Sequence, residues 1–224
     1  KKPAFWVIVV AVIASVITKI GLDHTAILGD TIEKKKKKKC GIIKNAPVIT
    51  SFNQTKEALS VLKQYNPIIP NTEKLKIIKS DVFCNEFLYD GVLYKTSLSG
   101  EYQIENALIV IETALKLGVS EGILQKALVN TFFPARMEVI CKNPTVILDG
   151  AHNPDGADAL SKVMQKYNGE ITAIIGMCAD KDCEKVLKTT LPYCKRVIVV
   201  EIGGMPRSLK VVELAKKKKK YSTC

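Results

Sequence analysis

The sequence predicts an α/β fold whose second half contains a parallel, doubly wound sheet. Strand-like and helix-like segments alternate along most of the chain after Pro47, and such alternation is typical of parallel sheets covered by helices. Apolar residues make up 47% and charged residues 25% of the chain, which is the balance of a globular protein. With 224 residues, the chain is long enough for one large domain or two ordinary ones.

The first apolar segment, Ala4–Ile17, contains Ser15 as its only polar residue and follows Lys1 and Lys2. It is shorter than the roughly 20 apolar residues that a membrane-spanning helix needs. It is similar to the core of a signal peptide, but its Val and Ile content also fits two buried strands in succession. We favour the strands and expect no membrane association.

The next elements follow from periodicity and turn residues. We expect a strand over Val48–Ser51 and a helix over Gln54–Tyr65, which two prolines end. A hairpin is expected from Phe83–Tyr89 and Val92–Lys95, because the intervening Asp90-Gly91 supplies the positive φ angles of a tight turn.

The clearest helix covers Glu101–Leu117, where apolar residues recur at spacings of four, three and four. Gly118 follows it in the usual C-terminal position. A second helix is expected over Ser120–Val129, with Ser120 as its N-cap. Phe132-Phe133-Pro134 then breaks the pattern, so we place an interdomain linker there and domains at residues 1–133 and 134–224.

The second domain has the more regular alternation of strands and helices, which predicts its parallel sheet. Its expected strands are Val146–Leu148, Ile171–Gly176 and Arg196–Glu201, and its expected helices are Asp155–Tyr167, Glu184–Thr190 and Ser208–Lys216.

The net charge of +12 comes from lysine runs. Thirteen lysines lie at positions 1–2, 34–39 and 216–220, so the rest of the chain is nearly neutral. A nucleic-acid-binding face spreads its basic residues among aromatic ones and uses arginine, and the chain has three arginines. We therefore expect no nucleic-acid partner. The seven cysteines form no CxxC pair, which favours reduced thiols and a cytoplasmic location.

The two histidines, His24 and His152, both follow expected strands. A histidine on the surface without a function is the plain alternative for each. However, Asp149-Gly-Ala-His-Asn-Pro154 lies between a strand and a helix, where a carboxylate and backbone N–H groups converge. That arrangement suits a ribose hydroxyl and a phosphate.

Four segments, in order, resemble the folylpolyglutamate synthase/dihydrofolate synthase family, a branch of the Mur-ligase-like amide ligases. They are Gly21-Leu-Asp-His-Thr-Ala-Ile-Leu-Gly-Asp-Thr31, Cys40-Gly-Ile-Ile-Lys44, Gly100-Glu-Tyr-Gln-Ile-Glu-Asn-Ala107, and Pro134-Ala-Arg-Met-Glu138 with the Asp149–Pro154 phrase. The resemblance implies that residues 1–133 are the C-terminal part of a P-loop-type central ATPase domain. Residues 134–224 would be a Rossmann-like glutamate-ligase domain.

The resemblance also implies a reaction: ATP phosphorylates a folate or dihydropteroate carboxylate, and L-glutamate attacks the acyl phosphate. Mg²⁺ would neutralise the phosphates, and the enzyme would be a monomer. Carried over residue by residue, the resemblance assigns the metal to His24 and a carbamylated, catalytic role near it to Lys39. It assigns the nucleotide to Gln103, Asn106, Arg136, Asp149 and His152, the last also as a catalytic residue on the phosphate side.

Several features depart from the family pattern. No Gly-x-x-x-x-Gly-Lys-Ser/Thr segment occurs, lysines occupy positions 34–38, and Tyr102 stands where a histidine is usual. Lys39 could also be simply the last member of a solvated run, and Arg136 could simply pair with a carboxylate. Another Mur-type amide ligase and a nucleotide-binding remnant without activity therefore remain as alternative functions.

Overall fold

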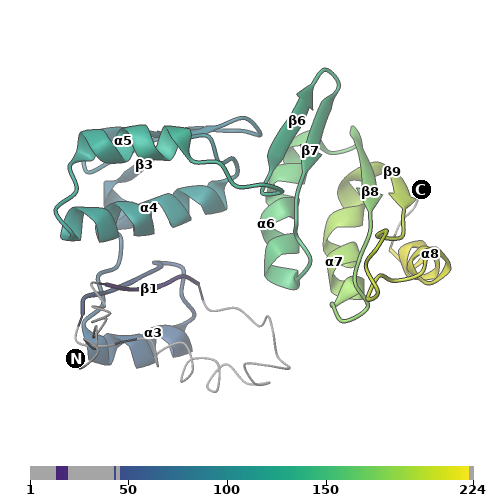
Figure 1. Ribbon diagram of the computed structural model, residues 1–224, viewed down its shortest axis with the longest axis horizontal. Helices are drawn as coiled ribbons and strands as arrows, with labels where there is room; N and C mark the ends of the chain where they lie inside the picture. Colours follow the sequence, from purple (N-terminus) through teal and green to yellow (C-terminus); the bar gives the residue numbers. More distant parts are fainter. Residues whose placement is uncertain (1–13, 20–42, 44–45, 222–224) are drawn as a thin grey trace, which may run out of the picture. The chain divides into compact units, whose positions relative to one another are not determined.

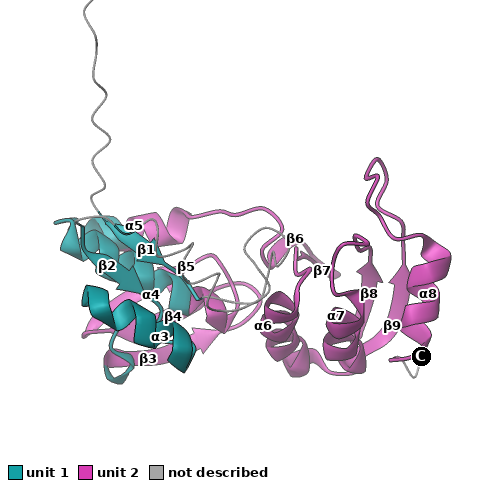
Figure 2. Cartoon of the chain, turned by 90° about the horizontal axis from the view of Figure 1, so that it is seen from below, with its two compact units in different colours: residues 1–73, 105–124 teal, residues 74–104, 125–224 magenta. Residues whose placement is uncertain are grey.

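The computed structural model describes residues 14–19, 43 and 46–221 (Figure 1). The chain divides into two compact units (Figure 2). Unit 1 comprises residues 1–73 and 105–124, and unit 2 comprises residues 74–104 and 125–224. No helix among the described residues is both long and apolar enough to cross a membrane.

Unit 1 contains a parallel pair of strands, β1 (Ser15–Ile17) and β2 (Val48–Thr50). Helix α3 (Lys56–Leu62) begins after Thr55, whose side chain accepts the N–H of Ala58, and continues into the 3-10 turn η1 (Lys63–Tyr65). One apolar cluster joins these elements through the buried side chains of Ile17, Val48, Ala58 and Leu62. The predicted strand and helix are therefore confirmed, whereas residues 4–13 lie outside the described part of the chain.

The 3-10 turn η2 (Thr72–Lys74) ends at the first residue of unit 2. Unit 2 continues with a three-stranded antiparallel sheet of β3 (Leu75–Ser80), β4 (Asn85–Tyr89) and β5 (Val92–Thr96). Asp90 and Gly91 have φ angles of 50° and 79°, so the predicted hairpin is confirmed. Phe87 and Tyr94 stack with ring centroids 5.9 Å apart in its core.

Helix α4 (Glu101–Lys116) and helix α5 (Glu121–Asn130) confirm the two predicted helices. Ile104, Leu108 and Ile111 are buried along α4, as the spacing predicts. Gly118 follows α4 with a φ of 81°, the left-handed conformation that commonly ends a helix.

The region after the linker starts with β6 (Glu138–Lys142) and β7 (Thr145–Leu148), which pair antiparallel. The later strands β8 (Ile171–Ile175) and β9 (Cys194–Val199) pair parallel, as predicted. The parallel sheet expected for all three predicted strands is thus found for two of them, because the first pairs with its immediate neighbour along the chain.

Helices α6 (Pro154–Met164), α7 (Cys183–Thr190) and α8 (Val211–Lys219) follow the predicted order, with η3 (Gln165–Tyr167) and η4 (Leu191–Tyr193) as short extensions of α6 and α7. Their apolar faces meet β8 and β9 in one core, whose fully buried members include Ala157, Leu187 and Leu214.

Candidate functional site

The turn between β7 and α6 holds the Asp149 carboxylate in a half-buried position. One oxygen accepts the N–H of Ala151 at 2.8 Å and the other accepts the N–H of Met137 at 2.9 Å. Burial raises the pKa of Asp149, while these two amides and the Arg136 charge act in the opposite direction. A half-buried carboxylate is costly without polar partners, and two backbone amides supply them here.

The rest of the turn is held by local hydrogen bonds. The Nδ1 atom of His152 lies 2.7 Å from the carbonyl oxygen of Gly150, so the ring orientation is fixed relative to the turn. The Asn153 side chain accepts the N–H of Gly156 at 2.7 Å and caps α6, with Pro154 in the first helical turn. His152 thus lies just before a helix N-terminus, where backbone N–H groups favour anions.

Arg136 follows the predicted linker by two residues, and its exposed guanidinium lies 5.8 Å from the centroid of the Phe133 ring. Among the described residues it stacks on this ring and forms no ion pair with a carboxylate. Its donors are therefore directed at solvent from a backbone position that Asp149 fixes through the neighbouring Met137.

Tyr102, at the start of α4, lies near the charges of Asp149 and Arg136. Burial, and after it the Asp149 charge, raise the pKa of Tyr102 to about 12, against the lowering effects of a hydrogen bond with Gln103 and of the Arg136 charge. The charges of both side chains therefore act on the pKa of Tyr102. Tyr102 and Ile147, which precedes the Asp149 turn on β7, also pack against one apolar cluster of Val82, Met137 and Val163.

The remaining predicted site residues are placed differently. Gln103 is 7% exposed and Asn106 is exposed, although both lie on α4. His24 and Lys39 lie outside the described residues. The structure thus brings Arg136 and Asp149 together beside Tyr102, with Gln103 hydrogen-bonded to Tyr102 and His152 in the Asp149 turn.

Sequence reasoning missed Asn85, whose side chain is fully buried. Its Nδ2 donates to the carbonyl oxygens of Leu98 and Gly100 at 2.7 and 3.1 Å, which fixes the turn that leads into α4. A signal existed, because Asn85 shares its face of β4 with the buried Phe87 and Tyr89, where a polar residue needs partners.

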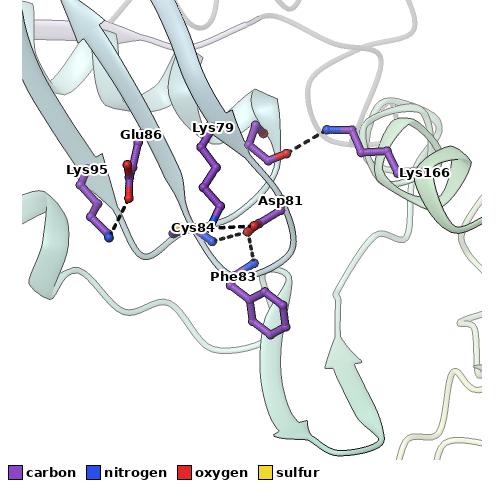
Figure 3. Close-up of polar contacts among 8 residues, drawn as sticks. Lys79, Asp81, Phe83, Cys84, Glu86, Lys95 and Lys166 are labelled. Atoms are coloured by element: carbon purple, nitrogen blue, oxygen red, sulfur yellow. Dashed lines mark hydrogen bonds and ion pairs between the residues drawn. The ribbon is translucent and has the colours of Figure 1, made fainter.

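Sequence reasoning also missed that the β3–β4 turn is hydrogen-bonded to the end of the α6 region (Figure 3). Asp81 accepts the N–H groups of Phe83 and Cys84 at 2.8 and 3.0 Å and pairs with Lys79 at 3.1 Å. Lys166, from the end of the α6 region, donates to the Ser80 carbonyl at 3.1 Å. The turn is therefore tied to the helix that starts at the Asp149 turn.

Residues 135–223 match the family model described as Mur ligase, glutamate ligase domain. The folylpolyglutamate synthase of Lacticaseibacillus casei is 30% identical over 221 residues, covering 90% of this chain and 51% of that protein. The dihydrofolate synthase/folylpolyglutamate synthase of Bacillus subtilis is 33% identical over 203 residues, covering 80% of this chain and 46% of that protein. The chain thus spans about half the length of these relatives.

Two solved structures of folylpolyglutamate synthases are also similar to this chain. Mycobacterium tuberculosis folylpolyglutamate synthase complexed with ADP and AMPPCP superposes with a TM-score of 0.76 at 23% identity, covering 93% of this chain and 52% of that one. A complex of a folylpolyglutamate synthase with AMPPCP and folate gives 0.73 at 27% identity, covering 91% of this chain and 55% of that one. The first of these likenesses establishes the shared α/β fold.

Proposed function

We propose that the chain works as an ATP-dependent ligase, because residues 135–223 match the Mur ligase glutamate ligase domain model and the chain is similar to folylpolyglutamate and dihydrofolate synthases. The reaction joins L-glutamate to the carboxylate of folate or dihydropteroate through an acyl phosphate. The related structures hold ADP or AMPPCP, and one holds folate, which supports these substrates.

The convergence of Arg136 and Asp149 beside Tyr102 carries the proposal. An exposed guanidinium next to a carboxylate that its turn fixes can hold a phosphate and a ribose hydroxyl of one nucleotide. Each Asp149 oxygen accepts one backbone N–H and retains capacity for a hydroxyl donor.

The other roles follow from position. We assign the phosphate side to His152, which precedes the N-terminus of α6, and adenine contacts to Gln103 and Asn106 on α4. Mg²⁺, which would neutralise phosphate charge, is assigned to His24 and to the region of a carbamylated Lys39 on the sequence resemblance.

We further propose that residues 1–133 and 134–224 are the two functional domains and that the linker allows them to close over the nucleotide. None of the five described cysteines forms a disulfide, which supports a reducing compartment such as the cytoplasm. A monomer is proposed from the family resemblance.

The decisive experiment incubates the full-length protein with ATP, Mg²⁺, L-glutamate and a panel of acceptors, and measures phosphate release. Release that requires a pteroate-type acceptor supports the proposal. Release with a cell-wall peptide acceptor would favour another Mur-type amide ligase, and nucleotide binding without turnover would favour a remnant.

Site variants test the assignment of residues by calorimetry. Arg136→Lys should lose most of its ADP affinity, since an ammonium cannot replace a bidentate contact. Arg207→Lys is the matched control, because Arg207 is exposed and its side chain pairs, among the described residues, with the exposed Asp180. Asp149→Asn should weaken ATP binding more than glutamate binding. Wild-type binding and turnover in both site variants would refute the site.

A further inference from the structure

The residue immediately before Arg136 and the residue immediately after it have an unusual backbone conformation. Ala135 has a φ of 52° and Met137 a φ of 51°. This left-handed region is unfavourable for residues with a Cβ atom, and neither alanine nor methionine is among the residues that tolerate it best. Such strain persists where the surrounding structure imposes it, and it concentrates at functional sites.

Both strained residues are held by carboxylates. The N–H of Ala135 donates to Glu138 Oε2 at 2.8 Å, and the N–H of Met137 donates to Asp149 Oδ2 at 2.9 Å. Hydrogen bonds to an ionised acceptor are roughly twice as strong as neutral ones. We call this pair of contacts, from Glu138 and Asp149 to the two amides, the linker clasp.

The carbonyl groups of the same two residues are also fixed. The Ala135 oxygen accepts the N–H of Gly150 at 2.8 Å, and the Met137 oxygen accepts the Ser99 hydroxyl at 3.2 Å. Met137 further anchors the linker with a side chain that is 4% exposed. The backbone on each side of Arg136 is therefore fixed, while the Arg136 side chain itself is exposed.

Glu138 is the member of the clasp for which the proposed function gives no role. It opens β6, where its backbone pairs with Leu148, yet its half-buried carboxylate turns back to an amide three residues earlier. The backbone hydrogen bonds that pair β6 with β7 require no charged side chain at this position. The contact with Ala135 accounts for the acidic residue at this position.

We propose that Glu138 is a positioning residue: its carboxylate holds Ala135 in the left-handed conformation and thereby aims the Arg136 guanidinium at the nucleotide phosphates. The inference rests on the proposed function for the identity of the ligand. Without the carboxylate, Ala135 relaxes toward negative φ, and Arg136 leaves the orientation in which a phosphate can be bound without further cost.

Hydrogen exchange tests the clasp without any ligand. In the full-length protein, the amide hydrogens of residues 135–137 should exchange faster in Glu138→Ala than in wild type, and Glu138→Gln, which keeps an acceptor oxygen, should be intermediate. Glu170→Gln is the control, since Glu170 is exposed and its only contact among the described residues is through its backbone. Unchanged exchange in Glu138→Ala would overturn the clasp.

ADP affinity then tests positioning. Glu138→Ala should bind ADP about ten-fold more weakly, the loss expected when one left-handed residue is no longer held. Adding Ala135→Gly to Glu138→Ala should recover most of this loss, because glycine adopts positive φ without a steric cost. A purely structural role predicts a lower melting temperature but wild-type ADP affinity in the folded protein, and no recovery by glycine.

Different results would refute the proposed nucleotide site and the positioning role of Glu138. If the wild-type protein binds no ADP, the proposed nucleotide site is wrong, while the exchange data still decide whether Glu138 holds the linker. If wild type binds ADP and Glu138→Ala binds it equally well with faster exchange, the site stands and the positioning role is refuted.

Discussion

The Asp149 carboxylate accepts the backbone N–H of Met137 at 2.9 Å, so the end of β7 and the linker share one polar group. Its other oxygen accepts the N–H of Ala151. A residue assigned to nucleotide binding thus also maintains the local structure of its own site, and its effects on stability and on binding must be separated.

Asp149→Ala should lower the free energy of unfolding by about 2 kcal/mol, because two amide N–H groups lose their acceptor in a half-buried turn. Urea unfolding measures the change. Asp158→Ala, on the exposed side of α6, should change stability by less than about 0.5 kcal/mol. Equal effects of the two variants would show that the carboxylate does not fasten the linker.

The sequence predicts these elements best where local chemistry alone determines them. The spacing of Ile104, Leu108 and Ile111 identifies α4 because one face of that helix is buried, and Asp90-Gly91 identifies its turn because the required φ values are intrinsic to those residues. Strands β3 and β6 escaped prediction, because most of their residues are exposed or half-buried and show no clear alternation.

The residues of the candidate site also divide into those that the local sequence predicts and those that it does not. Asp149 and His152 are predictable from the strand–turn–helix order. The left-handed Ala135 and Met137 are not, because neither residue type favours that conformation and their N–H groups are held by carboxylates from other positions, Glu138 and Asp149.

Gly100, with a φ of 89°, begins the turn into α4. A Cβ atom at this position would lie 2.8 Å from Cε1 of Tyr102, so Gly100→Ala combines a positive-φ cost with a clash. Gly118→Ala is the matched control, because Gly118 has a φ of 81° and open space around its Cα.

We expect Gly118→Ala to cost about 1 kcal/mol and Gly100→Ala to cost at least about 2 kcal/mol in thermal or urea unfolding. The excess for Gly100→Ala measures the displacement of the Tyr102 ring. Equal losses would mean that the ring moves without cost.

Asn85 is fully buried and donates to two carbonyl oxygens of the turn before α4. Asn85→Ala should destabilise the protein by about 3 kcal/mol, because it leaves both acceptors without this donor and opens a small cavity. The control is Asn130→Ala, since the side chain of the exposed Asn130 donates to the Lys126 carbonyl oxygen within its own helix end. A loss for Asn85→Ala as small as that of the control would contradict the assigned role.

Tyr102 gives the site a signature in alkaline solution, because burial raises its pKa from 10.0 to about 12. The folded state favours the neutral phenol, so its contribution to stability is complete below pH 10 and is lost as the pH rises through 12. The free energy of unfolding should fall over this interval by about 1–2 kcal/mol, less than the full shift would give, because solvent screens the partly exposed phenol. Tyr102→Phe should remove that part of the slope, whereas the variant Tyr65→Phe, at an exposed ring, should retain it.

The lysine run at positions 216–220 has a structural role within unit 2. Glu184 on α7 accepts Lys217 at 3.3 Å, Lys220 at 3.4 Å and the Tyr221 hydroxyl at 3.0 Å, and the Tyr221 bond followed by the two lysine bonds lowers the pKa of Glu184. These contacts fasten the C-terminal end of α8 to α7. They also explain why a run expected to be solvated includes the half-buried Lys217.

Because the folded-state pKa of Glu184 is lowered, its stabilising effect is present above its ordinary value of 4.5 and is lost as the pH falls through the lowered value. Lys217→Ala should therefore lower the melting temperature at pH 7 more than at acidic pH, and Lys219→Ala, at an exposed position, should have little effect at either. Nucleotide affinity should stay within a few-fold of wild type in both variants. A large loss of ATP affinity in Lys217→Ala that persists at high salt, where exposed charges are screened, would instead place this run in the binding site.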